Sequence, residues 1–208
     1  FNGIINEKVK EIDPKIKLKL NQVNFKLNPS NFEFEIFTLD PHLLVNEKKV
    51  DLEIIKSDLN LLDYLNNKNP ISEISIISKE SNIDQFTDFI NEYDFNLARN
   101  LIFKQIKQGK VKIISNINFN ENNPQNIKYN INGYVKDAKI KLLNQSKIEN
   151  IKFNFFVDQD FINLNKIELV FDKIFVSSEK VNIKKINNYF DISGNFKTNK
   201  TKINLKNY

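Results

Sequence analysis

The sequence predicts an α+β fold that is mostly antiparallel β, a meander sheet with one or two amphipathic helices packed on it. Apolar residues alternate with polar ones through most of the chain, as in "KIKLKL" at 15–20, which is typical of strands with one face in water. Asn-rich and Pro-containing stretches such as "NPSN" interrupt the alternation at short intervals, as tight turns do. Helical spacing replaces the alternation near the N-terminus and in the middle of the chain.

Residues 1–109 are expected to hold short strands between an entry helix and a central helical segment. The opening "FNGIINEKVKEIDP" spaces its apolar residues as a short amphipathic helix does, and Pro14 ends it. A further turn of helix is expected at "SDLNLLDYL", 57–65, where a strand ends. The alternating apolar residues predict the strands Ile16–Leu20, Val23–Leu27, Phe32–Ile36 and Val50–Ile54, and the strand "ISEISIIS" at 71–78.

The central segment, 82–109, predicts one broken helix or two that pack on the sheet. Its apolar residues recur at steps of three and four from Ile83 to Tyr93 and again from Leu97 to Ile106. Gly109 is the expected cap residue at its end.

Residues 110–208 predict an antiparallel meander that continues the same sheet. Apolar residues alternate with polar ones almost throughout, and the Asn-rich breaks predict strands of about five residues. "INGYVKDAKIKLLN" from Ile131 resembles "ISGNFKTNKTKINLKN" from Ile192, a weak internal repeat about 60 residues apart. Gly133 and Gly194 are the equivalent glycines, where we expect strand bends or the close approach of another group.

The composition disfavours a nucleic-acid-binding role in spite of a net charge of +5. Arg99 is the one arginine among 31 basic residues, whereas phosphate and base recognition favours arginine forks. The abundance of Lys, Asn, Ile and Phe is explained by a bias toward A/T-rich codons. The absence of Met and the start at Phe1 predict a segment excised from a longer chain.

Catalytic and metal-binding motifs are missing, so we predict that the chain is not an enzyme and needs no cofactor. The chain has no Cys, which excludes disulfides, thiolate metal sites and a cysteine nucleophile. The single histidine, His42 in "LDPHLL", is expected to be a loop residue without a catalytic partner. Paired carboxylates such as Asp84 with Asp88, and Asp158 with Asp160, are expected to be solvated on a helix face or in a turn.

The Phe-rich apolar stripes can form an ordinary core, but the second part of the chain predicts many strands and almost no helix to cover them. Such a meander must roll into a barrel, stack into a sandwich or curl into a trough whose apolar side is covered by something else. A ligand is one such cover.

The order of features resembles the bacterial AsmA-like family, the group that includes TamB and the YhdP-type bridge-like lipid transfer proteins. The resemblance rests on the helix-like entry, on "LDPHLLVNEKKVDLEIIKSDLNLLDYL" and "ISEISIISKES", and on the unit "GYVKDAKIKLLN … IENIKFNF". It covers essentially the whole chain and is a likeness of apolar patterns, with no invariant chemical signature.

The resemblance implies the membrane-proximal segment of a periplasmic protein, anchored in the inner membrane by an N-terminal helix that would precede Phe1. It implies a curved, elongated sheet forming an open apolar trough, non-enzymatic, that carries phospholipid acyl chains between the inner and outer membranes and so supports the cell envelope. The alternative is a closed β-sandwich that serves as a structural or interaction module without lipid. The expected groove-lining residues are Val111, Ile113, Ile117, Phe119, Val135, Ile140, Phe153, Phe155, Ile167, Leu169, Phe171 and Val176.

Overall fold

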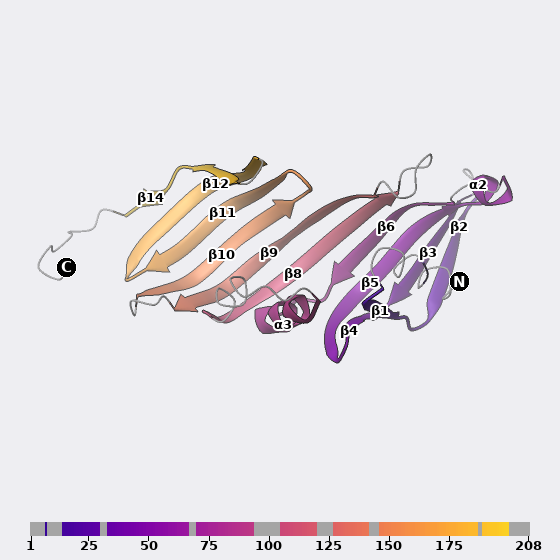
Figure 1. Cartoon of the computed structure of the whole chain (residues 1–208), viewed down its shortest axis with the longest axis horizontal. Helices are drawn as coiled ribbons and strands as arrows, with labels where there is room; N and C mark the ends of the chain where they lie inside the picture. Colours follow the sequence, from indigo (N-terminus) through magenta and orange to yellow (C-terminus); the bar gives the residue numbers. More distant parts are fainter. Residues whose placement is uncertain are drawn as a thin grey trace, which may run out of the picture.

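The computed structural model of the chain shows one large antiparallel sheet with few helices (Figure 1). The structure describes residues 7, 14–29, 33–66, 70–93, 105–119, 127–141, 146–186 and 189–199. The elements of the first part of the chain are β1 (Ile16–Lys19), β2 (Val23–Asn28), β3 (Glu33–Leu39), β4 (His42–Val45), β5 (Lys48–Asn60), α2 (Leu61–Leu65), β6 (Ile71–Ser78), β7 (Ser81–Asn82) and α3 (Ile83–Tyr93). Those of the second part are β8 (Ile106–Phe119), β9 (Ile127–Lys141), β10 (Lys147–Val157), β11 (Phe161–Phe171), β12 (Ile174–Ile186), β13 (Tyr189–Gly194) and β14 (Lys197–Thr198).

The sheet is open, and its strands follow one another as a meander. Ten of its 14 strands run in the order β1-β4-β5-β6-β8-β9-β10-β11-β12-β13, with β3 beside β5, β2 beside β3, β7 beside β8 and β14 beside β12. The boundary between residues 109 and 110 falls inside β8. This arrangement confirms the predicted mostly antiparallel meander, and it excludes a closed sandwich or barrel for the described strands.

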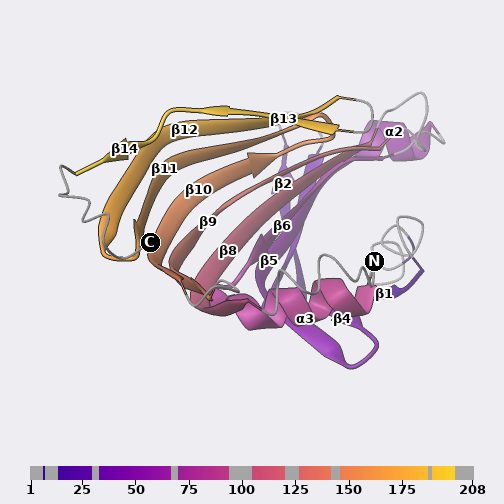
Figure 2. The same ribbon diagram turned by 60° about the vertical axis from the view of Figure 1, so that its left-hand side comes forward.

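The strands curve, and α3 lies on the concave side of the sheet (Figure 2). The apolar residues of α3 recur at helical spacing, and Phe86 belongs to the buried core with Val111 of β8. Ile83 and Phe89 pack against the same cluster. The core is densest under β3, β5 and β6, where the almost fully buried side chains are Ile36, Leu52, Ile55, Ile71 and Ile74.

Several local predictions hold. The turn of helix at the end of a strand is α2, whose N-cap Asn60 accepts hydrogen bonds from the amides of Leu62 at 2.9 Å and Asp63 at 3.2 Å. Asp158 shapes the β10–β11 turn, because its Oδ1 accepts from the amides of Asp160 at 2.8 Å and Phe161 at 2.9 Å.

Other predictions about segments are wrong or fall outside the described residues. The described part of the central helix is α3 at Ile83–Tyr93, and Ile106, which was expected to be helical, belongs to β8. Gly109 is no helix cap but a residue inside β8 with φ +138, where a β-carbon would lie 2.8 Å from that of Ala138. Apart from Glu7, which is helical, the expected entry helix up to Asp13 lies outside the described residues, as does the repeat of helical spacing at 97–102.

The strands β8 to β12 are much longer than the predicted five residues. The strand β9 has 15 residues and β12 has 13. The prediction fails because internal polar residues, which suggested turns, lie within continuous strands. The apolar pairs Ile174 with Val176 and Val181 with Ile183 both belong to the single strand β12.

Candidate functional site

The predicted groove-lining residues of β8, β9 and β10 share one face of the sheet. Val111 pairs with Val135, which pairs on its other side with Phe153. Ile113 pairs with Gly133, which pairs with Phe155. Because alternate residues of a strand point to the same side, Ile117 and Phe119 of β8 belong to this face too. Ile140 lies on the same face through its pairing with Ile148 of β10.

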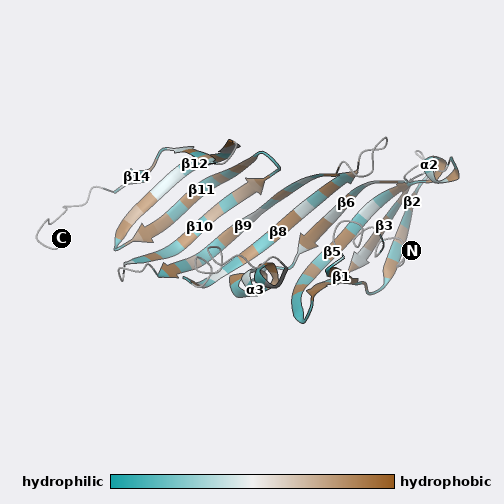
Figure 3. Cartoon of the chain, viewed as in Figure 1, coloured by the Kyte–Doolittle hydropathy of each residue, from teal (hydrophilic) through white to brown (hydrophobic). Residues whose placement is uncertain are grey.

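The same face continues across β11 and β12. Ile148 pairs with Phe171, which pairs with Ile174, and Leu169 pairs with Val176. Ile167 lies two residues before Leu169 and therefore points to the same side. The register thus places all the predicted lining residues on the face that carries α3, which we call the apolar face. Figure 3 shows hydrophobic and hydrophilic positions alternating along these strands.

Residues in the left-handed backbone conformation occur at one position in each of four neighbouring strands. They allow the same face to be apolar along the full length of these strands. Gly109 in β8, Asp137 in β9, Asn150 in β10 and Lys166 in β11 all have positive φ. The register shifts of β8, β9, β10 and β11 occur around these positions, so they are β-bulges. At each bulge the apolar–polar alternation of the sequence shifts by one residue. The extra residue of the bulge compensates for this shift, so the apolar side chains on both sides of the bulge point to the same face.

Gly133 and Gly194 have a different role from these bulges. Gly133 keeps a regular register with β8 and β10, and Gly194 pairs with Val181 at the end of the β12–β13 ladder. A β-carbon on Gly133 would collide with the carbonyl oxygen of Lys112 and lie 2.8 Å from Cζ of Phe155. Of the two roles predicted for these glycines, the contacts fit close approach.

The apolar face is most exposed at the edge strand β13, although Ile151, Ile167 and Val181 on the strands before it are buried. Val111 and Val135, near α3, are 5% and 6% exposed. Phe153, Phe155, Leu169, Phe171 and Val176 are half-buried. At the edge strand β13, Phe190 is 62% and Ile192 is 65% exposed. The described part of the chain therefore leaves a broad apolar surface open to a ligand or partner, which is uncommon for a soluble surface.

Sequence reasoning missed further residues of the apolar face. The pairing of Phe155 with Leu164 and of Val157 with Ile162 places these residues there. Val181 and Ile183 of β12 pair with Leu164 and Ile162 and therefore also lie on the apolar face. The bulge at Lys166 separates Ile162 and Leu164 from Ile167 and Leu169 by a change of phase, whereas Val157 continues the alternation of Phe153 and Phe155.

The opposite face, which we call the polar face, is mostly polar, although the rings of Phe156 and Phe161 stack on it with centroids 5.7 Å apart, and cross-strand charges stabilise it. Lys112 Nζ lies 2.6 Å from Glu53 Oε2, and Lys152 Nζ lies 2.7 Å from Glu168 Oε2. Glu80 Oε2 accepts from the Tyr134 hydroxyl at 2.6 Å and lies 3.3 Å from Lys136 Nζ. These hydrogen bonds, that of Tyr134 first, lower the pKa of the Glu80 carboxyl, and Glu80 in turn raises the pKa of Lys136.

The single histidine lies on a strand and not in a loop. His42 is the first residue of β4, with Nδ1 2.8 Å from Oδ1 of Asp51. Partial burial raises the pKa of Asp51, but Lys49, His42 and Lys79 together outweigh it and lower the pKa. Within the described ranges, no three His, Cys, Asp or Glu side chains gather as metal ligands.

No described helix is both long and apolar enough to cross a membrane. Comparison of the chain with protein-family models, with curated proteins and with solved structures finds no match.

Proposed function

We propose that the apolar face between β8 and β13 is a groove that holds the acyl chains of phospholipids, and that the chain moves lipid without catalysis. The observation that carries this proposal is the continuity of the face. The register joins apolar side chains across adjacent long strands, and α3 covers them at one end alone among the described elements.

The energetics of acyl chains explain why such a face suits lipid movement. Burial of one CH₂ is worth about 0.8 kcal/mol, so moving a sixteen-carbon chain into water costs on the order of 12 kcal/mol. A continuous apolar surface replaces water along the route and removes most of this barrier, while the headgroup stays in solvent. No nucleophile, general base or metal is required for such a role.

The wider setting that we propose follows from the resemblance to the AsmA-like family. In that setting the chain is the membrane-proximal part of a periplasmic protein anchored in the inner membrane, and it passes phospholipid toward the outer membrane. The long, curved and open antiparallel sheet supports this proposal. The partners are then phospholipid acyl chains and the inner membrane, with no nucleic acid.

Lipid extraction and native mass spectrometry of the purified chain test the proposal. We expect co-purified phospholipid with the wild type. Phe155→Asp and Leu169→Asp place a charge on the apolar face and are expected to remove the lipid. Phe156→Asp and Val170→Asp are the matched controls, because these half-buried neighbours lie on the polar face of the same strands.

Circular dichroism establishes that each variant is folded before its lipid is measured. Loss of lipid in the apolar-face variants alone supports the groove. Folded Phe155→Asp and Leu169→Asp variants that retain as much phospholipid as the controls would overturn it.

A further inference from the structure

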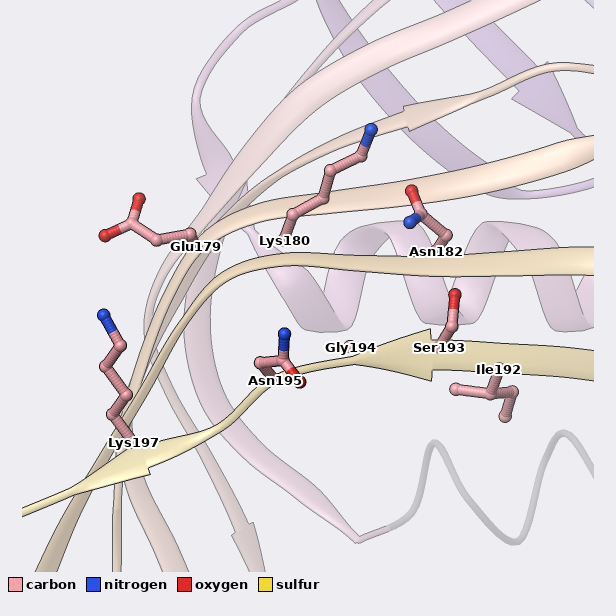
Figure 4. A pocket seen from close by; sticks show the side chains of 8 residues that line it. All are labelled: Glu179, Lys180, Asn182, Ile192, Ser193, Gly194, Asn195 and Lys197. Carbon is pink, nitrogen blue, oxygen red and sulfur yellow. The ribbon is translucent and has the colours of Figure 1, made fainter.

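A cavity of about 700 Å³ opens at the edge of the sheet between β12, β13 and β14 (Figure 4). It lies where the ladder is interrupted. The strand β13 pairs with β12 as far as Gly194 opposite Val181, and β14 resumes the pairing at Lys197 opposite Ser177. Asn195 and Phe196 leave the ladder between them. The cavity is lined by Glu179, Lys180, Asn182, Ile192, Ser193, Gly194, Asn195 and Lys197.

The polar side chains of this cavity suit an anionic group that accepts several hydrogen bonds. Lys180, Asn182, Ser193 and Asn195 extend to the same side of the strands, whereas Ile192 points to the other side (Figure 4). Lysine ammonium groups, amide N–H groups and a hydroxyl are the donors that bind phosphate oxygens. The lining carries Lys180 and Lys197 against the single carboxylate of Glu179.

Lys180 and Lys197 have no charged partner among the described residues, as is also true of Lys128 and Lys184, and their place in the cavity lining is what distinguishes them. Lys112, Lys136 and Lys152 each have a carboxylate within ion-pairing distance. Within the described residues, no ion pair joins Lys180 or Lys197 to a carboxylate. Their charges are therefore not neutralised by neighbours, and they attract an anion.

The cavity also adjoins the apolar face. Ile192 pairs with Ile183 and Gly194 pairs with Val181, and both of these β12 residues belong to the apolar face. Among the described strands, β13 and β14 form the edge of the sheet, so a molecule can lie with its apolar part against Ile183 and Ile192 and its polar part around this edge in the cavity. This two-sided geometry fits an amphiphile with a charged headgroup.

We infer that this cavity binds a phosphate group, supplied by the headgroup of a lipid whose acyl chains lie on the apolar face. The inference rests on the proposed function for its acyl-chain part. Lys180 and Lys197 supply the charge, and Ser193, Asn182 and Asn195 supply further donors. The same chemistry would also bind a free phosphate ester, so the test distinguishes the two sources.

The test compares Lys180→Gln/Lys197→Gln with Lys128→Gln/Lys184→Gln in the whole chain. The control pair removes the same charge from exposed positions of β9 and β12 that do not line the cavity. The probes are glycerol 3-phosphate and inorganic phosphate, dioctanoylphosphatidylglycerol, and dioctanoylglycerol, which has acyl chains but no phosphate. Binding is measured by calorimetry for the water-soluble probes and by native mass spectrometry for the lipids.

We expect the cavity variant to weaken binding of the phospholipid about tenfold or more, with binding of dioctanoylglycerol unchanged and the control close to the wild type. Loss of free phosphate binding together with phospholipid binding supports a phosphate site open to both sources. Loss of phospholipid binding alone supports a headgroup site. Equal binding of every phosphate probe by the cavity variant and the control overturns the inference.

The same binding measurements distinguish failure of the acyl-chain proposal from failure of the phosphate site. If the wild type does not bind dioctanoylglycerol, the groove proposal is wrong. A cavity-dependent response to glycerol 3-phosphate in that case still identifies the phosphate site, now with a free phosphate ester as its ligand. A wild type that binds none of the phosphate probes contradicts the phosphate site even where dioctanoylglycerol binds.

Discussion

The ring of Phe155 covers Gly133, its Cζ lying 2.8 Å from the position that a β-carbon on Gly133 would occupy. The residues are cross-strand partners in β10 and β9, and the carbonyl oxygen of Lys112 approaches the same position from β8 even more closely. Gly133→Ala therefore forces three strands apart. We expect it to lower the free energy of unfolding by about 3 kcal/mol, measured by urea denaturation.

Gly194→Ala is the comparison for this substitution. A β-carbon there would meet Cγ2 of Val181 at 2.7 Å, which is a side-chain atom beside the exposed edge strand β13. The side chain can move, so we expect a loss of about 1 kcal/mol. A Gly133→Ala variant as stable as the wild type would show that the three strands are not packed this closely.

Lys166→Gly is expected to stabilise the chain, contrary to the usual effect of glycine in a strand. Lys166 has φ +52 inside β11, a conformation that costs an L-residue about 1 to 2 kcal/mol and costs glycine almost nothing. Because the conformational entropy of glycine offsets about 1 kcal/mol of this relief, we expect a gain of up to about 1 kcal/mol in the free energy of unfolding. Lys184→Gly, at an exposed position of β12 outside the positive-φ set, is expected to lose about 1 kcal/mol. Losses of equal size at both sites would contradict the bulge at Lys166.

Acid is expected to weaken the contacts that Glu80 makes with Tyr134 and Lys136. Because the pKa of Glu80 is lower in the folded chain than in the unfolded chain, its carboxylate stabilises the fold above the ordinary glutamate pKa. This contribution is lost as the pH falls through the lowered, folded-state pKa. Urea denaturation between about pH 6 and pH 3 should show a shallower loss of stability for Glu80→Gln than for the wild type.

Glu179→Gln is the control for this pH dependence. Its carboxylate is exposed, and no ion pair joins it to a cation in the described part of the chain. We expect this variant to follow the wild type over the same pH range. Parallel curves for the wild type and Glu80→Gln would contradict the role of Glu80.

Phe86 anchors α3 on the apolar face, and its truncation should release the helix. The side chain is 9% exposed and packs in the core with Val111. Phe86→Ala is expected to lower the free energy of unfolding by about 3 kcal/mol and to speed amide hydrogen exchange in α3. Gln85→Ala, at the neighbouring exposed position, should change stability by less than about 0.5 kcal/mol. Unchanged exchange in the Phe86→Ala helix would show that the contact does not hold it.

The alternation of apolar residues predicts the sheet and part of its apolar face. Val111, Phe153, Leu169 and Val176 lie on one side as predicted, because the period of two is a direct consequence of strand geometry. The sequence did not reveal that separate short alternations are parts of one strand. Asn150 and Lys166 join these alternations, each within one strand, by adopting the left-handed backbone conformation. Tertiary pairing imposes this conformation, and the local propensity of Lys does not indicate it.

Gly109 and His42 were misplaced for a related reason. A glycine after a run of helical spacing is a common helix end, but here it occupies a bulge opposite Ala138, a partner 29 residues away that local reading does not include. The Pro before His42 suggested a loop, yet β4 begins directly after it and pairs with β5. The cavity at β12 was invisible to the sequence because it arises from an interruption of pairing between strands.

The bulges at Gly109, Asp137, Asn150 and Lys166 lie next to one another in four neighbouring strands and form a line across the sheet. Each of these strands has its own bulge, so the bend of the sheet is shared among several bulges. A substitution that removes one bulge leaves the bulges of the neighbouring strands in place, and these maintain the curvature of the sheet. The curvature of the sheet is therefore a collective property of several strands and does not depend on any single bulge.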